Sequence, residues 1–515
     1  MKREILYLFC LFTILLVSII MKIYFYMIGD FFTGDEANII IPLMQNNIEN
    51  VMFAFKYPGE QVPPLYCLIQ KFIANIAGIN EYSMRFLSLL FGIINLFVFI
   101  QFSKEFLNKK LSIIIAIALF AINLTQISFS AMVKPYIIDV TVLMLFVLYL
   151  TKTIKNNKIS TYTIKSYILQ FFSFCIAYLI SLPSIFIGPT TLLILMINEA
   201  INKTENTKKN LINIFSVSIL NAIALAVYYF FFLIRFKSQE RLNNEWLIGY
   251  GFFPNTEKEI FQLVNFLFDT AAYWGGTKKI VVVCILSLIF LGTFLYIINI
   301  IRKKENLIYF IVLVSPIFIM LVCGAMHLYP FANRLILFLL PIFIILIAKT
   351  IDYLDRKKLL ISILFTGLFY FYFYNSDIIQ TYRYIITQKK SPWTCAAYRE
   401  LYKNLKEIPQ NTPIIIGDGI FMTNYVYNHI YNFKPKKIIY TYYYPQLVEY
   451  INYEHHIKNL KNEKTIYVLW VTCGERENVD KFKEKFLDKN YNIELIAENE
   501  RQDLGRVILE KYTIK

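Results

Sequence analysis

Long apolar runs constrain this chain more than any other feature of its sequence. A membrane-spanning helix needs about 20 mainly apolar residues, and we count eleven runs of that kind. The first extends from Ile5 to Ile28 with Lys22 as its only charge. It is too long for a secretory signal and lacks a small-residue cleavage site, so we expect an uncleaved anchor. The other cores are Tyr82–Phe102, Leu111–Leu124, Met132–Leu150, Tyr162–Ile180, Ile185–Ile197, Leu211–Ile234, Ile280–Ile301, Leu307–Met326, Leu335–Ala348 and Leu359–Tyr374.

The short pair on either side of Ser181-Leu182-Pro183-Ser184 has an alternative, a hairpin that enters and leaves on one side. Outside the runs, positive charge is distributed unevenly. With a cytoplasmic N-terminus, the inner loops hold clusters such as Arg302-Lys303-Lys304, whereas the short outer loops Thr125–Ala131 and His327–Asn333 hold no lysine or arginine before Arg334. This is the bias of bacterial membrane proteins. The formal net charge of +16 is therefore assigned to topology and membrane lipids, and nucleic acid is not an expected partner.

Three longer segments are expected on the outer side. They are residues 29–81, residues 235–279 and the tail. The tail changes to short β-branched runs, which suggest a small α/β domain. We expect a mainly α polytopic membrane protein, with a transmembrane module at 1–374 and an extracytoplasmic α/β domain at 375–515. The expected strands are Pro413–Ile416, Lys437–Thr441, Thr465–Thr472, Asn492–Ala497 and Arg506–Glu510.

Ionisable residues in or beside the outer ends of the spans are candidates for a site, because charge in a membrane is expensive and usually functional. They come from separate parts of the sequence, and all could face one outer cavity. Other interpretations stay open: headgroup anchors for Lys22, Arg85 and Arg334, a structural pair of Lys134 with Asp139, and a helix cap for Asp35. The full set is Lys22, Asp30, Asp35, Glu36, Arg85, Lys134, Asp139, His327 and Arg334.

Five short motifs occur in order along residues 1–350. Together they resemble the bacterial relatives of the protein O-mannosyltransferases and of the lipid A aminoarabinose transferases, which are GT-C-fold glycosyltransferases. No single motif is specific, but the ordered set is fairly so. The motifs are Gly34-Asp35-Glu36-Ala37, Pro63-Pro64-Leu65-Tyr66, Gly78-Ile79-Asn80-Glu81-Tyr82-Ser83-Met84-Arg85-Phe86, Lys134-Pro135-Tyr136-Ile137-Ile138-Asp139, and Tyr329-Pro330 followed by Asn333-Arg334-Leu335 and Pro341.

The resemblance implies transfer of a sugar, with inversion, from a polyprenyl-phosphate donor to a lipid, glycan or protein acceptor on the outer side. A carboxylate can remove the proton of the acceptor hydroxyl; we assign this to Asp35, and expect Glu36 to orient the site or hold an ion. Fixed cations can stabilise the leaving lipid phosphate. The candidates are Arg334, Lys134 and Arg85, with supporting roles for Asp139, His327 and Tyr136.

The chain departs from that family at two places. Gln61-Val62 stand where many relatives have Glu-Lys, and Lys134 replaces a commoner arginine. No cofactor is indicated, and a divalent metal stays an open question. Two alternatives to an enzyme remain: a transporter of a lipid-linked or small solute, and an inactive glycan-binding relative. The sequence names neither sugar nor acceptor. Its lysine, isoleucine and asparagine content suggests a low-GC bacterium, and the expected location is the plasma membrane.

Overall fold

The structure, a computed structural model, describes residues 2–28, 32–44, 62–156, 159, 163–202, 206–233, 261, 265, 268–274, 279–353, 408–409, 412–416, 437–440, 464–472, 491–501 and 505–515. The chain divides into two compact units. The first contains Met1–Tyr26, Val62–Tyr66 and Phe86–Arg383, and the second contains Met27–Gln61, Cys67–Arg85 and Tyr384–Lys515. The predicted boundary between residues 374 and 375 lies outside the described residues and stays a prediction.

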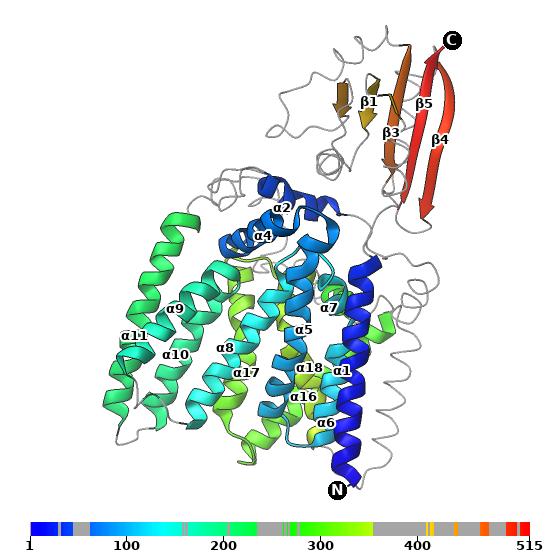
Figure 1. The fold of residues 1–515 in the computed structure, drawn as a ribbon. Helices are drawn as coiled ribbons and strands as arrows, with labels where there is room; N and C mark the ends of the chain where they lie inside the picture. Colours follow the sequence, from blue (N-terminus) through cyan, green and yellow to red (C-terminus); the bar gives the residue numbers. More distant parts are fainter. Residues whose placement is uncertain are drawn as a thin grey trace. The chain divides into compact units, whose positions relative to one another are not determined.

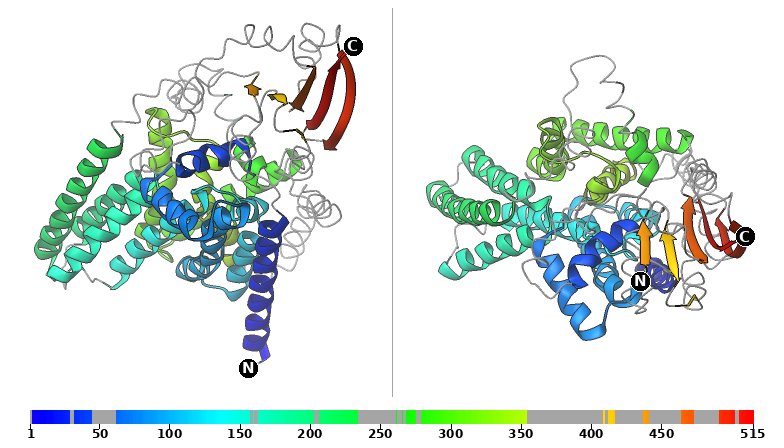
Figure 2. Two further views of the ribbon diagram at one scale, coloured as in Figure 1. Left: turned by 45° about the horizontal axis from the view of Figure 1, so that its top comes forward. Right: turned by 90° about the horizontal axis from the view of Figure 1, so that it is seen from above.

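The first unit is a bundle of helices that alternate in direction along the sequence (Figure 1). Helices α9, α10 and α11 lie side by side in both orientations of the molecule (Figures 1 and 2). The helices are α1 (Lys2–Ile28), α5 (Glu81–Phe106), α6 (Lys110–Ala121), α7 (Leu124–Phe129), α8 (Tyr136–Asn156), α9 (Ile164–Ile180), α10 (Ser184–Asn202), α11 (Thr207–Tyr228) with the π turn η3 (Tyr229–Leu233), α16 (Lys279–Ile301), α17 (Leu307–Ala325), the 3-10 helix η5 (Asn333–Leu339) and α18 (Leu340–Tyr353).

Eight described helices are long and apolar enough to cross a membrane. Two shorter apolar helices, Lys110–Ala121 and Ile164–Ile180, occupy two further predicted spans. The remaining predicted core, Leu359–Tyr374, lies outside the described residues. The mainly helical membrane fold expected from the sequence is therefore confirmed, while the count of eleven stays a prediction.

The turn between α9 and α10 is compact and hydrogen-bonded. Ser184 Oγ donates to the carbonyl oxygens of Ala177, at 2.9 Å, and Ser181, at 2.6 Å. These bonds add to the backbone bonds that the same two carbonyls accept from Ser181 N and Ser184 N, at 2.9 and 3.3 Å. The turn joins two antiparallel helices of 17 and 19 residues.

A charged network closes the end of the bundle at which the N-terminus lies. Lys349 on α18 is 1% exposed; its Nζ lies 3.2 Å from Glu305 Oε1 and 4.4 Å from the ring centre of Tyr296. Asp352 accepts bonds from Lys109 N, at 2.8 Å, and Ser112 Oγ, at 2.7 Å, and so caps the start of α6. Lys349 is thus buried and paired.

The second unit contains α2 (Gly34–Met44), most of α4 (Pro64–Ala77) and the first residues of α5. Two long-range bonds hold these helices together. Lys71 Nζ donates to the carbonyl oxygen of Leu43 at 2.5 Å, and Gln70 Nε2 donates to that of Met84 at 2.9 Å.

The second unit also contains a five-stranded sheet with the order β2-β1-β3-β5-β4. Strand β1 pairs in parallel with β2 and β3, and β5 pairs antiparallel with β3 and β4. All five strands cover or overlap the predicted β-branched runs. They are β1 (Pro413–Ile416), β2 (Lys437–Tyr440), β3 (Thr465–Thr472), β4 (Tyr491–Arg501) and β5 (Gly505–Ile514).

Candidate active site

The start of α2 is fixed by a capping box. Glu36 N donates to Thr33 Oγ1 at 3.2 Å, and Thr33 N donates to Glu36 Oε2 at 2.8 Å. This reciprocal pair is the Thr-x-x-Glu arrangement that satisfies free N–H groups at a helix N-terminus. Thr33 is therefore the capping residue of α2, and Asp35 is the second residue of the helix.

Glu36 and Arg85 form a buried ion pair. Arg85 Nε lies 2.9 Å from Glu36 Oε1, and Arg85 Nη2 lies 3.0 Å from Glu36 Oε2. The two side chains are 2% and 0% exposed. The Arg85 guanidinium also lies 5.5 Å from the ring centre of Phe32. Two parallel bonds of this kind give strength and a fixed geometry, so Arg85 holds the first turn of α2 through Glu36.

The loop before α5 places Arg85. Gly78 has a φ of 74°, a backbone conformation that glycine adopts without strain. Asn80 Oδ1 accepts from Ser83 N at 2.9 Å, and Ser83 Oγ donates to the carbonyl oxygen of Gly78 at 2.5 Å. The family-like segment from Gly78 to Arg85 is therefore a helix stop followed by a helix start that positions the arginine.

Asp35 is half-buried at the N-terminal end of α2, next to the fully buried Glu36. Carboxylates are stabilised at this end of a helix by its free N–H groups. The two adjacent acids thus have different surroundings, and Asp35 is the more accessible of the two. Asp30 lies outside the described residues.

In the first unit, the start of α8 carries a second group of predicted site residues. Lys134, Tyr136 and Asp139 are 1%, 9% and 5% exposed. Ser88 Oγ donates to the carbonyl oxygen of Lys134 at 3.3 Å, and Asn95 Nδ2 donates to that of Ile137 at 2.9 Å. These bonds fix the start of α8 against α5.

Asp139 and Tyr136 lie close to Tyr329, which the sequence analysis quoted in a motif but did not assign to the site. Burial raises the pKa of the Tyr329 phenol, and the nearby Asp139 carboxylate and Tyr136 phenol raise it further. Tyr329 is thus a neutral donor, and its hydroxyl donates to the carbonyl oxygen of Leu335 at 2.9 Å. Asp139 Oδ1 is buried and has no hydrogen-bond partner among the described residues.

Lys134 and Asp139 form no ion pair with each other in the described part of the chain. The buried Asp139 oxygen can therefore accept a bond from a hydroxyl or ammonium group of a ligand. Tyr329 belongs to the motif Tyr329-Pro330 that precedes Arg334, and this was the only sequence feature that could have drawn attention to it. Nothing in that motif shows that Tyr329 lies beside residues of α8.

The two remaining predicted residues lie after α17. His327 is exposed, with a φ of 53°. Arg334 is half-buried in the first turn of η5, which packs against α8. Asn333 N donates to Thr270 Oγ1 at 3.3 Å, so the segment 268–274 supports the start of η5. The structure thus brings Glu36 together with Arg85, and Tyr136 together with Asp139 and Tyr329.

Lys22 differs from the headgroup anchor considered above. It is 1% exposed, and its Nζ donates to Ser130 Oγ at 3.3 Å. A snorkelling lysine keeps its charged end in water, so that interpretation of Lys22 is wrong. Val62, at the place where relatives carry lysine, is a 1% exposed apolar side chain.

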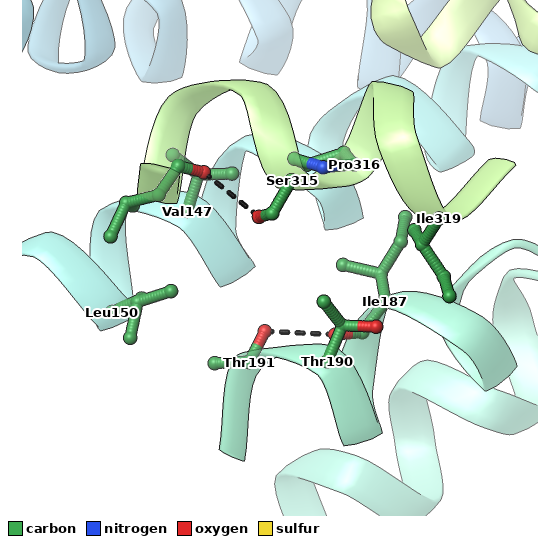
Figure 3. Close-up of a pocket in the computed structure, with 9 residues that line it drawn as sticks. Val147, Leu150, Ile187, Thr190, Thr191, Ser315, Pro316 and Ile319 are labelled. Atoms are coloured by element: carbon green, nitrogen blue, oxygen red, sulfur yellow. Dashed lines mark hydrogen bonds between the residues drawn. The ribbon is translucent and has the colours of Figure 1, made fainter. Parts of the chain in front are cut away.

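A small cavity between α8, α10 and α17 is separate from these groups (Figure 3). Pro316 leaves the carbonyl oxygen of Val312 without its helical N–H partner, and Ser315 Oγ donates to that oxygen at 3.2 Å. The lining residues include no charged side chain, so the cavity is not part of the candidate site. They are Val147, Leu150, Ile187, Thr190, Thr191, Val312, Ser315, Pro316 and Ile319. Among the described residues, no three acidic, histidine or cysteine side chains gather in a metal-binding cluster.

Comparison with known proteins bears on the fold of the chain. Residues 61–229 match the family model of dolichyl-phosphate-mannose-protein mannosyltransferases. Over 99% of its length the chain superposes on 98% of ArnT from Cupriavidus metallidurans in the apo state, with a TM-score of 0.53 and 10% identity. The chain has a GT-C fold.

The same ArnT bound to undecaprenyl phosphate matches this GT-C protein over 99% of its length and 98% of ArnT, with a TM-score of 0.51 and 9% identity. A search of curated proteins by sequence gave no match. At this level of identity the likeness to ArnT establishes the fold, and the roles of individual residues are argued from their own surroundings.

Proposed function

We propose that this GT-C protein is a membrane glycosyltransferase that moves a sugar from a polyprenyl-phosphate donor to an acceptor on the predicted outer side, with inversion at the anomeric carbon. The observation that carries the proposal is the agreement of fold over nearly the whole chain with ArnT, whose structure holds undecaprenyl phosphate. The mannosyltransferase family match over residues 61–229 supports the same class of reaction.

Asp35 is the proposed base. It lies beside a rigid ion pair, half-exposed at the start of α2. A carboxylate in that position can take the proton of the acceptor hydroxyl as its oxygen attacks the anomeric carbon. The bond from that carbon to the phosphate oxygen breaks at the same time, and the electron pair stays with the lipid phosphate. One displacement of this kind inverts the configuration.

Lys134 and Arg334 are the proposed contacts to the donor phosphate. Fixed cations are effective there because negative charge grows on the leaving phosphate in the transition state. The sequence also suggested Arg85 for this role, and that prediction stays untested. Its two bonds to Glu36 support a different one, in which Arg85 positions α2 through Glu36.

Asp139, Tyr136 and Tyr329 are proposed to bind polar groups of the sugar. They offer a carboxylate oxygen with no described partner and a neutral phenol. His327 is a further supporting candidate at the exposed end of α17. We propose residues 1–374 as the catalytic module and 375–515 as a domain that modulates access of the acceptor.

The test uses purified full-length protein in detergent with labelled polyprenyl-phosphate sugars, and membranes from cells lacking the gene as the source of acceptor. If the protein is a glycosyltransferase, one of the tested labelled donors is consumed, and polyprenyl phosphate is released in proportion to the labelled product. Movement of intact donor between the faces of a vesicle, without release of polyprenyl phosphate, would identify a transporter. Donor binding without turnover for every sugar and acceptor fraction would favour an inactive glycan-binding relative.

A further inference from the structure

Helix α1 meets the rest of the first unit along one narrow stripe. Only Ser18, Lys22 and Phe25 are buried among its described residues, whereas Leu8, Phe12 and Ile20 on other faces are 60%, 63% and 53% exposed. Positions three and four apart lie on one face of a helix. The buried Lys22 therefore lies at the centre of the face through which α1 packs on the rest of the first unit.

Lys22 reaches the end of α7. Its Nζ donates to Ser130 Oγ, and Ser130 Oγ donates in turn to the carbonyl oxygen of Gln126 at 2.6 Å. Ser130 is the C-cap of α7, where the backbone carries partial negative charge that favours a cation. Gly92 on α5 provides the space that the Ser130 side chain occupies, because a Cβ atom at Gly92 would overlap Ser130 Oγ.

The turn from Ser130 to Pro135 connects this contact to Lys134. It is stabilised by bonds from Ala131 N to the Ser128 carbonyl oxygen and from Lys134 N to that of Met132, both at 2.9 Å. Ser88 Oγ binds the carbonyl oxygen of Lys134 at the other end. The turn is thus held at its start by α1 and at its end by α5.

We propose that Lys22 is a positioning residue, which fixes through Ser130 the turn that presents Lys134. This rests on the proposed function, in which Lys134 contacts the donor phosphate. Lys22 is buried too deeply to serve as a headgroup anchor. No acidic side chain forms an ion pair with it in the described part of the chain, so removing its charge leaves no carboxylate unpaired.

The functional arm of the test measures transfer kinetics of the full-length protein. Lys22→Met raises the KM for the polyprenyl-phosphate sugar by about 10- to 100-fold, because a misplacement of about 1 Å costs up to about 100-fold. Lys22→Arg, which keeps the charge, restores part of the loss. Ser130→Ala has the same effect as Lys22→Met, and the double variant is no worse than either, as expected for residues that act through one contact.

Ser18→Ala is the matched control. Ser18 lies one turn before Lys22 on the same stripe, and its Oγ donates to the carbonyl oxygen of Ala121 at 2.7 Å. Its loss loosens the seat of α1 without touching the turn, so the KM should not change. An equal rise in KM for Ser18→Ala would reduce Lys22 to a packing residue and overturn the proposal.

The structural arm needs no activity. Hydrogen–deuterium exchange of the amides of residues 130–134 becomes faster in Lys22→Met and stays unchanged in Ser18→Ala. Faster exchange with an unchanged KM would remove Lys134 from the donor site, against the proposed function, while the link from Lys22 to the turn stands. A raised KM with unchanged exchange would mean that Lys22 acts directly on the donor, and no change in either would leave it without a role; both results overturn the proposal.

Discussion

Two adjacent acids at the start of α2 have distinct surroundings. Glu36 is fully buried and holds both Thr33 and Arg85, whereas Asp35 is half-exposed. A general base must be accessible to the acceptor. Glu36 is not, because it is buried and bound to Arg85. These surroundings fit the proposed roles, in which Asp35 is the base and Glu36 holds the first turn of α2 in place.

Asp35→Asn should nearly abolish transfer while leaving the protein folded. Asparagine keeps the size and hydrogen-bonding ability of the side chain but cannot accept a proton at neutral pH. Loss of a general base lowers the rate by about 100- to 10,000-fold. Rates of donor turnover, with thermal unfolding recorded for the same samples, check this. Near-normal turnover would exclude Asp35 as the base.

Glu36→Gln should instead destabilise the protein. It removes the carboxylate charge that pairs with the buried Arg85 guanidinium, and breaking such a pair costs about 3–5 kcal/mol. We expect a lower Tm than in Asp35→Asn, which is the matched control one residue away. A Glu36→Gln protein with wild-type Tm and no turnover would transfer the catalytic role to Glu36.

Arg334→Ala should weaken donor binding more than any other single change among the predicted outer-face residues. An arginine can bind a phosphate with two parallel hydrogen bonds, which lysine cannot reproduce, so Arg334→Lys should also bind less tightly. Titration with undecaprenyl phosphate measures both. An affinity equal to the wild type in Arg334→Ala would leave the residue as a headgroup anchor.

Some of these surroundings could be foreseen from local sequence, and others could not. Thr33-x-x-Glu36 is a capping-box pattern, so the start of α2 could be predicted from local sequence, although the only cap considered above was Asp35, as an alternative to its role as base. The partner of Glu36 is 49 residues away, and that of Lys22 is 108 residues away. Nothing local separates a lysine that reaches water from one that meets a serine on another helix.

At the scale of helices, close packing of α16 on α18 depends on a glycine. A Cβ atom at Gly292 would overlap the carbonyl oxygen of Leu346. Gly292→Ala should therefore separate the two helices and lower the Tm, with a cost of about 1–3 kcal/mol for overpacking. Gly324→Ala is the milder comparison, because an added Cβ atom there would lie 3.1 Å from Phe331 Cβ, a tight contact that a small shift relieves. Equal Tm values for the two variants would contradict this packing.

The helices themselves followed from the sequence because their apolar runs are long. The ends of α17 were predicted to within one residue, whereas the predicted ends of α8 and α10 differ from the observed ones by one to six residues. The 3-10 helix η5 was not predicted. The apolar run that begins at Leu335 gives no sign that the chain winds there as a 3-10 helix, which is tighter than an α-helix. Likewise the burial of Lys349 depends on Tyr296 of α16 and on Glu305 in the turn after that helix, which the sequence around Lys349 does not reveal.

At the scale of the whole molecule, the predicted orientation places the N-terminus in the cytoplasm and the tail outside. Alkaline phosphatase fused after Lys515 should be active in a bacterial host, because alkaline phosphatase becomes active only when it is exported from the cytoplasm. The matched fusion of a cytoplasmic reporter at that point should be inactive. The reverse result would show an even number of spans, with the hairpin alternative at Ser181–Ser184 as the first explanation.

We propose above all that this GT-C protein transfers a sugar to an acceptor at the cell surface, with Asp35 as the base. Mass spectrometry of surface glycans tests it most directly, on cells that lack the gene and carry either the wild-type gene or Asp35→Asn. We predict that one sugar is missing without the gene, that the wild-type copy restores it, and that an equally abundant Asp35→Asn protein does not. Identical glycans in all strains, or full restoration by Asp35→Asn, would contradict the account.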